Sequence, residues 1–500
     1  MTTTHEASTP GAIRSLIPAR IDRLPWSPFH TRMVVALGVA WILDGLEITV
    51  ASSVVALLTK HEALGISSTQ AGLLATVYLA GEVVGALFFG SLSDKLGRKK
   101  LFIVTLAVYL IGSGLTALTL SNGVGWLVFL YATRFISGMG IGGEYAAINS
   151  AIDELIPARF RGRVDIMVNG TYWAGAIIGT LGTLIFLNQL SPNIGWRVAF
   201  LLGPVLGLVI ILVRRNLPES PRWQVMHGHA AEAEKTIDFI EHEVEQSGNQ
   251  LPRVSEDKAV EIKPAESIGY FALARLLFKE YPKRAVYGAT LMITQSFLYN
   301  AIFFTYTLVL SNFYGVDEKK APLFLIAFAV GNLSGPFVLG HLFDSVGRKK
   351  MISGTYILSG ILLAITAFLF KANALSATTQ TVAWCLIFFF ASAGASSAYL
   401  TVSEIFPQEV RAKAIAVFFA IAQCFGALGP VIYGALIGEG KDRMPLFGGY
   451  LLGAGVMIVG GLVAAFIGVS AEGRSLEDVA TPLAMRHPGT RAEGAARYSM

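Results

Sequence analysis

The feature that most constrains this chain is a set of long segments without any Asp, Glu, Lys or Arg. Four of them occupy residues 101–133, 166–196, 285–316 and 372–403. Because the apolar core of a bilayer needs about 20 apolar residues in each helix, each segment has room for one or two membrane-spanning helices. Charged residues make up 15% of the 500-residue chain, against about 25% in soluble domains. The pattern excludes soluble enzymes, secreted disulfide scaffolds and disordered proteins, and predicts a polytopic helical membrane protein.

The apolar segments predict an all-α membrane fold with twelve transmembrane helices in two six-helix bundles. The spans are expected at residues 33–58, 70–92, 101–120, 125–147, 166–187, 195–213, 285–310, 321–343, 351–370, 379–403, 414–437 and 446–470. The expected divisions are an N-terminal tail, a first bundle, a linker, a second bundle and a C-terminal tail, at residues 1–32, 33–213, 214–284, 285–470 and 471–500.

The charged linker has structure of its own. Ser220 and Pro221 predict an N-cap followed by the first residue of a short helix. Residues 230–245 and 267–280 predict amphipathic helices, the second lying along the membrane surface, and residues 248–266 predict a loose connection.

The basic residues indicate how the chain crosses the membrane. Most of its 39 Lys and Arg residues lie on one side if both tails are cytoplasmic, as the positive-inside rule expects. The net charge of +5 is therefore a topology signal and does not indicate a nucleic-acid partner. We expect a multi-pass protein of the plasma (inner) membrane with both termini cytoplasmic.

The two halves of the chain repeat each other. Residues 90–100 and 340–350 are identical at seven of eleven positions, at an offset of 250 residues. The same offset carries Glu154, Pro157 and Arg161 onto Glu404, Pro407 and Arg411. Duplicated six-helix halves are typical of alternating-access transporters, whose substrate site lies between the halves near the middle of the membrane.

These motifs resemble those of the major facilitator superfamily, in particular its sugar-porter and metabolite–proton symporter branch. The paired Gly-x-Leu-x-Asp-x-x-Gly-Arg-Lys-Lys segments carry the likeness. So do residues 134–143 (RFISGMGIGG), 218–223 (PESPRW) and 403–407 (SEIFP). The resemblance covers about residues 33–477.

Charged residues at the span ends are predicted to act as a gate. Opposite charges within the repeated motifs would pair at one membrane face, hold that face closed and separate when it opens. The expected pairs are Asp94 with Arg98, Glu154 with Arg161, Glu219 with Arg222, Asp344 with Arg348 and Glu404 with Arg411. The alternative is that these residues only fix topology and solvate the helix ends.

Charges inside the predicted spans are rare. Asp44, Glu47, Glu82, Arg134 and Glu144 all lie in the first half. Each costs at least about 2.5–3.5 kcal/mol at the middle of the membrane, so such residues are usually functional. Glu144 lies beside the glycine-rich residues 138–143 and is expected to be structural, whereas the role of Glu82 stays open.

Asp44 and Glu47 are three residues apart and point from one face of the first span. The resemblance to sugar porters implies a coupling acid at Glu47 with Arg134 as its partner, and residues 44–47 resemble the Asp-Gly-x-Asp of aromatic-acid–proton symporters. In the expected cycle, a proton neutralises Glu47, frees Arg134 and lets the loaded carrier reorient. The alternative is a static buried ion pair.

Uncharged polar and aromatic residues at depth are the candidate substrate ligands. The resemblance places Asn169 at a sugar-binding glutamine of the fifth span and Gln295 and Asn300 at the polar positions of the seventh. Aromatic candidates are Tyr172, Trp173, Tyr299 and Tyr399. The tenth-span Gly-Pro-x-x-Trp pattern of sugar porters is absent, which disfavours a plain hexose and leaves sugar acids, polyols, aromatic acids and other organic anions open.

The sequence therefore predicts a secondary active transporter, a proton-coupled symporter of a small polar metabolite, and not an enzyme. It contains no Walker loop and no metal-ligand motif, so we expect the proton gradient to supply the energy without a cofactor. The expected partners are the substrate, protons and the lipid bilayer, and the expected state is a monomer. The alternatives are a uniporter of the same substrates and a transporter-like nutrient sensor.

Overall fold

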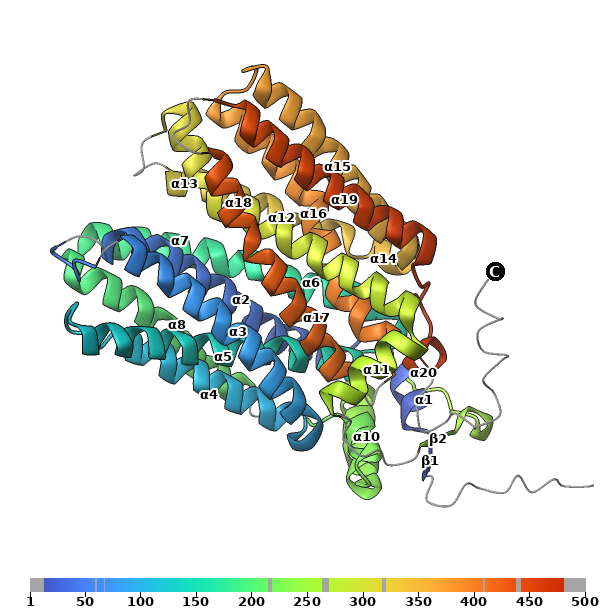
Figure 1. The fold of residues 1–500 in the computed structure, drawn as a ribbon. Helices are drawn as coiled ribbons and strands as arrows, with labels where there is room; N and C mark the ends of the chain where they lie inside the picture. Colours follow the sequence, from blue (N-terminus) through green and yellow to red (C-terminus); the bar gives the residue numbers. More distant parts are fainter. Residues whose placement is uncertain are drawn as a thin grey trace, which may run out of the picture.

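The computed structural model describes residues 13–58, 61–66, 68–214, 218–262, 269–316, 321–407, 410–437 and 442–480. The first half consists of α2 (Pro28–Leu58), α3 (Ser68–Leu96), α4 (Arg98–Thr116), α5 (Val124–Leu155), α6 (Ala158–Gly170), α7 (Tyr172–Gln189) and α8 (Pro192–Arg214). The second half consists of α12 (Pro282–Tyr314), α13 (Ala321–Leu339), α14 (Leu342–Ser345), α15 (Arg348–Lys371), α16 (Ala377–Ile405), α17 (Arg411–Gly426), α18 (Leu428–Ile437) and α19 (Met444–Ile467). Figure 1 shows two bundles of long helices, the first blue and green, the second yellow to red.

Shorter elements precede, connect and follow the bundles. They are β1 (Ile13–Ser15), α1 (Ile17–Asp22), α9 (Pro221–Met226), α10 (Ala230–Gln246), the 3-10 helix η1 (Glu256–Lys258), β2 (Val260–Ile262), α11 (Tyr270–Glu280) and α20 (Leu476–Val479). Those labelled in Figure 1 gather at one end of the molecule, which we call the linker end.

The helices predicted in the linker are confirmed. The Ser220 hydroxyl caps α9 by accepting a hydrogen bond from the backbone N–H of Trp223 at 3.1 Å. The amphipathic segments are helical as α10 and α11, although residues 267 and 268 lie outside the described part of the chain. The loose connection predicted at residues 248–266 is wrong in part. Its β2 pairs antiparallel with β1, Ile13 opposite Ile262, and this partner is too distant in sequence for a local pattern to indicate.

Two of the predicted spans are interrupted helices at corresponding places in the halves. The fifth span is broken at Thr171 between α6 and α7, and the eleventh at Ala427 between α17 and α18. Among the described residues, seven helices are by themselves long and apolar enough to cross a membrane, and the two broken spans are not among them. Broken helices in transporters occur where the backbone lines a cavity.

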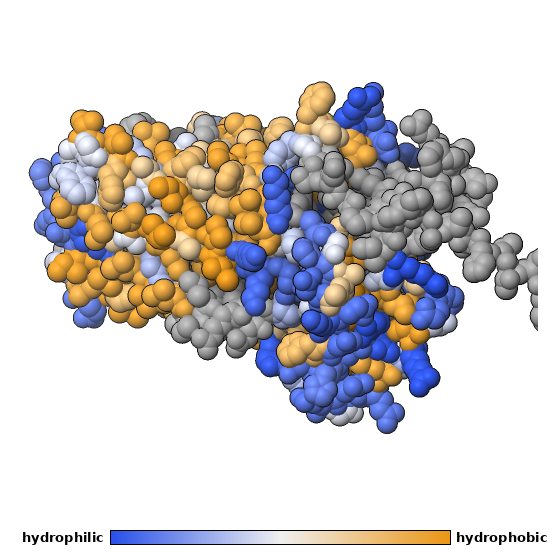
Figure 2. All heavy atoms as spheres, turned by 90° about the horizontal axis from the view of Figure 1, so that it is seen from below, coloured by the Kyte–Doolittle hydropathy of each residue, from blue (hydrophilic) through white to orange (hydrophobic). Residues whose placement is uncertain are grey.

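The outer surface of the bundles is apolar. Large apolar side chains stay exposed on helices of both halves, among them Phe88, Val128, Ile185, Phe368 and Phe466. Figure 2 shows hydrophobic residues covering the bundles, with hydrophilic residues concentrated towards the linker end. A surface of this extent is uncommon on soluble monomers and is expected where lipid is the solvent.

Inside the first half, glycines let α3 and α5 approach closely. A Cβ atom at Gly138 would lie 2.1 Å from the carbonyl oxygen of Tyr78, and one at Gly142 would lie 2.0 Å from that of Glu82. Only glycine fits such contacts, as in other tightly packed membrane helices. The glycine-rich segment thereby brings Arg134 on α5 against the charged face of α3 and α2.

The N-terminal segment is fastened to α10 by ion pairs. Arg20 contacts Glu234, Asp238 and Glu241, each at 2.6 Å, and Arg23 contacts Glu241 at 2.5 Å. Burial alone would raise the pKa of Glu241, but the hydrogen bonds from Arg20 and Arg23 outweigh burial and hold this pKa below its usual value.

We predict that Arg20→Gln loosens residues 13–22. The lost contacts are partly buried and charged, and such hydrogen bonds contribute about 1.5–3 kcal/mol, so amide hydrogen exchange measured by mass spectrometry should accelerate at least about tenfold there. In the wild type, the pKa of Glu241 is lower in the folded protein than in the unfolded chain, where it is about 4.3. The contribution of Glu241 to stability is therefore complete above about pH 4.3 and declines as the pH falls below that value. Lys235→Gln is the control, because Lys235 is an exposed residue of α10 that takes no part in these ion pairs. An unchanged exchange rate in Arg20→Gln would show that the Arg20 ion pairs do not hold residues 13–22 against α10.

Candidate functional site

A cavity lies between the two halves. Its volume is about 130 Å3, and its wall is formed by residues of both bundles, including α2, α5, α6 and α7 from the first half and α12, α16 and α17 from the second. The interrupted helices α6–α7 and α17–α18 both contribute to this wall.

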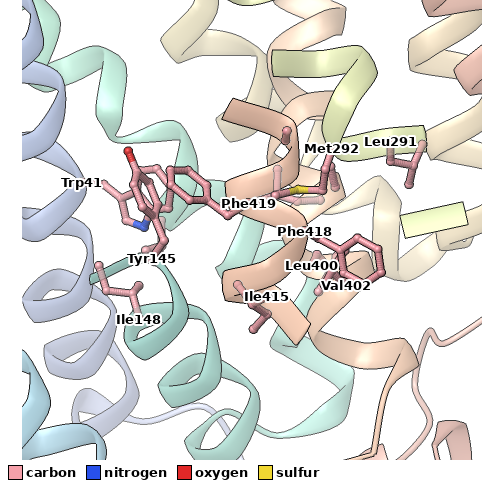
Figure 3. Packing of buried hydrophobic residues seen from close by; sticks show 14 of the residues in the cluster. Trp41, Tyr145, Ile148, Leu291, Met292, Leu400, Val402, Ile415, Phe418 and Phe419 are labelled. Atoms are coloured by element: carbon pink, nitrogen blue, oxygen red, sulfur yellow. The ribbon is translucent and has the colours of Figure 1, made fainter. Parts of the chain in front are cut away.

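Aromatic rings make up much of the cavity wall. They are Trp41, Tyr145, Tyr172, Trp173, Tyr299, Phe303, Tyr399 and Phe419. Tyr145 lies between the halves, with its ring centroid 4.2 Å from that of Phe419 and 5.9 Å from that of Tyr399. Figure 3 shows Phe419 directed from the second half towards Tyr145 and Trp41. These rings form a surface on which a flat ligand can stack.

Amide and hydroxyl groups complete the wall. They belong to Asn169, Gln295, Ser296, Asn300, Ser392, Ser396 and Gln423. Asn169 donates to the carboxyl of Asp165 at 3.1 Å, while its own Oδ1 has no hydrogen-bond partner among the described residues. The cavity therefore offers both donors and acceptors beside its aromatic surface.

The structure brings together all seven residues that the sequence singles out as candidate ligands. Asn169, Tyr172 and Trp173 lie on the first half's side of the cavity, and Gln295, Tyr299, Asn300 and Tyr399 on the other. Their role as substrate ligands stays a prediction.

The predicted coupling residues are also adjacent. The Arg134 guanidinium contacts the Glu47 carboxyl at 2.5 Å, and both side chains are buried. Glu47 also accepts hydrogen bonds from the hydroxyls of Tyr109 and Ser113, each at 3.1 Å. Arg134 lies over the Tyr78 ring, with its Cζ atom 4.5 Å from the ring centroid. The Glu47 carboxyl therefore has three hydrogen-bond donors, Arg134, Tyr109 and Ser113, which offset the cost of burying its charge.

Asp44 points to a different partner from Glu47. Its carboxyl accepts a hydrogen bond from the hydroxyl of Tyr145, a residue of the cavity wall. The other oxygen of Asp44 has no hydrogen-bond partner among the described residues. Tyr145 thus connects the cavity to the charged interior of the first half, a link that the sequence analysis missed because tyrosines in spans are usually packing residues.

The linker end contains the predicted gate residues, in pairs that repeat between the halves. Arg98 contacts Glu154 at 2.7 Å, and Arg348 contacts Glu404 at 2.6 Å, positions that are related by the offset of 250. The carboxyl of Glu219 accepts from the backbone N–H of Arg98 at 2.9 Å, and that of Glu472 accepts from the backbone N–H of Arg348 at 3.3 Å. Each half therefore carries the same charged motif.

Other ion pairs at the linker end join the two halves. Arg161 lies 3.6 Å from Glu404, and Arg411 lies 3.9 Å from Asp153. The carboxyl of Asp344 accepts from the backbone N–H of Arg163 at 2.7 Å. Asp153 and Arg161 are also 3.9 Å apart within the first half. These contacts close the linker end between the halves.

Several predicted pairings are wrong. Asp344 does contact Arg348, at 2.7 Å. The other three pairings differ, because the chain folds each motif against another helix: Glu154 lies against Arg98, Glu404 against Arg348 and Arg161, and Arg222 against Asp22 at 3.3 Å. The pairing of Asp94 with Arg98 lies outside what is described, since the Asp94 side chain is not among the described residues.

Three acidic residues of the linker end were not predicted from the sequence: Asp22, Asp153 and Glu472. Asp153 directly precedes Glu154 but is not repeated in the second half, where Ser403 takes its place, so the repeat gave no signal for it. Glu472 follows Glu219 by 253 residues, close to the repeat offset, and this near-match was an available signal. Burial raises the pKa of Glu219, although three backbone N–H groups and Arg98 act in the opposite direction.

A metal centre is not evident in the described part of the chain. Among those residues, no group of three or more His, Cys, Asp and Glu is placed to hold a metal ion.

Comparison with known proteins identifies relatives along nearly the whole chain. The niacin transporter NiaP of Acinetobacter baylyi is 24% identical over 92% of this chain and 99% of its own length. The benzoate transport protein of the same species is 25% identical over 89% of this chain and 91% of its own length. Among solved structures, the proton:xylose symporter XylE of E. coli, bound to 6-bromo-6-deoxy-D-glucose, has a TM-score of 0.75 at 19% identity and covers 90% of this chain and 98% of its own.

The family assignment follows from a match over most of the sequence. Residues 33–483 match the family described as Sugar (and other) transporter. The predicted fold class is confirmed, because the structural likeness to XylE extends over both bundles. The chain belongs to the sugar (and other) transporter family, in the sugar-porter branch of the major facilitator superfamily, and is a membrane transporter and not an enzyme.

Proposed function

We propose that the protein is a proton-coupled symporter of a small aromatic or similarly ring-shaped organic acid, which it moves by alternating access of its two bundles, residues 33–213 and 285–470. The observation that carries the proposal is the arrangement of the Glu47–Arg134 pair. This buried pair lies behind a cavity walled by aromatic rings and amides, and that cavity lies between halves held together at one end. We further propose a monomer in the plasma membrane, with the linker end and both termini in the cytoplasm, as the distribution of Lys and Arg favours.

The proton-coupling step uses the Glu47–Arg134 pair. An ionised Glu47 neutralises Arg134 in a region of low dielectric, where an unpaired charge is costly. A proton that binds Glu47 removes this attraction and leaves Arg134 over the rings of Tyr78 and Phe200 without its paired carboxylate. The change in charge alters the relative stability of the two carrier states. The hydrogen bond from Tyr145 to Asp44 offers a route by which the cavity communicates with this helix face.

The cavity favours a single flat ring. Its volume of about 130 Å3 is close to the ~150 Å3 of a protein cavity that holds benzene, so one six-membered ring with a small polar substituent fits. The aromatic wall provides stacking, and the amides provide hydrogen bonds to a carboxylate. The named substrates of two relatives, niacin and benzoate, have this shape and support the proposal.

The gate at the linker end can open without leaving its carboxylates Glu404 and Asp153 unpaired. When Arg161 leaves Glu404, Glu404 keeps Arg348, and when Arg411 leaves Asp153, Asp153 keeps Arg161. The cost of opening is therefore limited to the contacts between halves, which suits a switch between states of similar free energy.

We predict that Glu47→Gln abolishes coupled proton movement but not binding. In proteoliposomes containing a pH-sensitive dye, benzoate added outside should acidify the lumen of wild-type vesicles, and the rate should fall at least about tenfold in Glu47→Gln, because the amide cannot exchange a proton. Benzoate binding to the purified variant should persist. Glu62→Gln, at an exposed position outside the bundles, is the matched control.

The same vesicles distinguish the alternative function. Uptake of labelled benzoate without acidification in the wild type would rule out symport and indicate a uniporter in which Glu47–Arg134 is a static pair.

We predict a preference for aromatic acids. Binding to the purified wild type should be tightest for benzoate and nicotinate, about three- to tenfold weaker for cyclohexanecarboxylate, and weaker again for D-xylose. Cyclohexanecarboxylate has the same charge and ring size without the π system, whose contacts contribute about 0.5–1.5 kcal/mol. Isothermal titration calorimetry can rank the four. Tighter binding of xylose than of either aromatic acid would overturn the proposed substrate class.

We predict that Asp153→Asn opens the linker end. The change removes the carboxylate that faces both Arg161 and Arg411, so the closed state loses an attraction that the open state lacks. A coupling of about 1 kcal/mol corresponds to a roughly fivefold larger open population. Spin labels at Lys95 and Val346, exposed positions at the linker end of opposite halves, report this distance by double electron–electron resonance. Arg32→Gln is the control, since its pair with Glu243 is peripheral. Identical distance distributions would refute the gate.

A further inference from the structure

Glu82 is a buried carboxyl that takes no part in the proposed coupling step of Glu47 and Arg134. It lies on α3, one turn from Leu79 of the cavity wall, and is fully buried. Its Oε2 accepts a hydrogen bond from Nε2 of Gln423 at 2.8 Å, across the boundary between the halves. Its Oε1 has no hydrogen-bond partner among the described residues. A carboxyl in this setting is half satisfied, and such groups are rare without a function.

A chain of hydrogen bonds leads from Glu82 to the cavity. Gln423 accepts at its Oε1 from the hydroxyl of Ser296 at 2.9 Å, and the amide of Asn300 donates to Ser296 at 3.4 Å. All three residues beyond Glu82 line the cavity. Gly426 leaves the necessary space, because a Cβ atom there would lie 2.2 Å from the Ser296 oxygen and 2.4 Å from the Asn300 nitrogen.

The donor-to-acceptor direction of these hydrogen bonds depends on whether Glu82 holds a proton. The ionised carboxylate accepts only, so Gln423 must turn its NH2 group to Glu82 and its oxygen to Ser296. The Ser296 proton is then donated to Gln423 and is not available to a ligand. A protonated Glu82 can donate to the oxygen of a reversed Gln423 amide. The Gln423 NH2 group then donates to Ser296, whose proton becomes available to a ligand in the cavity.

The charge of Glu82 also makes anion binding depend on its protonation, in the same sense as the hydrogen bonds do. The predicted spans at 33–58, 70–92 and 125–147 together carry four carboxyls, those of Asp44, Glu47, Glu82 and Glu144, and a single cation, Arg134. An anionic ligand beside an ionised Glu82 would be repelled in this low-dielectric region. Protonation of Glu82 removes the repulsion.

The groups that face Glu82 set its surroundings. Electrostatic neighbours are Asp44 on α2, Arg134 and Tyr145 on α5, Tyr78 on its own helix, Tyr172 on α7 and Tyr399 on α16. From α17 the neighbour is Gln423, a neutral group. The positive charge among these electrostatic neighbours, Arg134, is paired with Glu47.

We propose that Glu82 is a second proton-binding residue, separate from Glu47, that controls the affinity of the cavity for an organic anion through Gln423 and Ser296. Uptake of a proton by Glu82 turns Ser296 into a hydrogen-bond donor towards the substrate carboxylate and removes a like charge, so the proton and the anion bind together. The inference rests on the proposal that the cavity binds an organic acid.

The test is the pH dependence of benzoate binding to the purified protein between about pH 6 and 9, where the ligand stays ionised. Wild-type affinity should fall with rising pH, by up to tenfold per pH unit where one proton is linked. Glu82→Gln should flatten this slope by about one proton and retain tight binding at high pH, and Gln423→Leu should flatten it with weaker binding throughout. Glu144→Gln, a buried carboxyl on α5, is the matched control and should keep the wild-type slope. A wild-type slope in Glu82→Gln would overturn the proposal.

A measurement without ligand separates this proposal from the substrate class. Infrared difference spectra of the free protein between low and high pH should contain a protonated-carboxyl band that is lost in Glu82→Gln and shifted in Gln423→Leu. If benzoate does not bind, the substrate class fails, and this band still decides the role of Glu82. Spectra identical in all three proteins would overturn Glu82 as a proton-binding residue.

Discussion

The buried ion pair between Glu47 and Arg134 is the interaction on which the interior of the first half depends. In an apolar environment each charge requires the other, and their 2.5 Å contact joins α2 to α5. The close approach of α5 to α3 at its glycines places Arg134 within reach. Two of the three remaining carboxyls, Asp44 and Glu82, are held by neutral donors, Tyr145 and Gln423, that belong to the cavity wall. The charged interior and the cavity therefore share one network.

The ion pairs at the linker end have a different role, since they must hold the two bundles together and still separate when that end opens. Each half satisfies its own charges by the same pair, Arg98–Glu154 or Arg348–Glu404, which the duplication preserved. The side-chain ion pairs between halves are longer, at 3.6 Å for Arg161–Glu404 and 3.9 Å for Arg411–Asp153, and each acid in them keeps a second partner. Strong pairs inside each rigid half and weaker ones between halves favour rigid-body movement over local unfolding.

The predicted candidate ligands come together because membrane helices are long rods whose polar faces must turn inward. Asn169, Gln295 and Tyr399 are remote in sequence, yet each interrupts an apolar span with a group that lipid cannot satisfy. Which residues form the linker-end gate was easier to predict than which of them pair with one another. The expected pairs Glu154–Arg161 and Glu404–Arg411 assumed that charges near in sequence meet, whereas helix packing places Arg98 and Arg348 against these acids.

The sequence by itself determined the membrane class, the twelve-helix duplication, the family and the set of polar residues that the bilayer forces into the interior. Hydropathy and internal repetition are properties of the chain, so no structure is needed to read them. Only the tertiary structure decided how most charges at the linker end pair, that β1 pairs with β2, and that Glu82 reaches Gln423 across the halves. Such contacts join residues between 56 and 341 positions apart, and their geometry is set by how the chain packs, which no local pattern encodes.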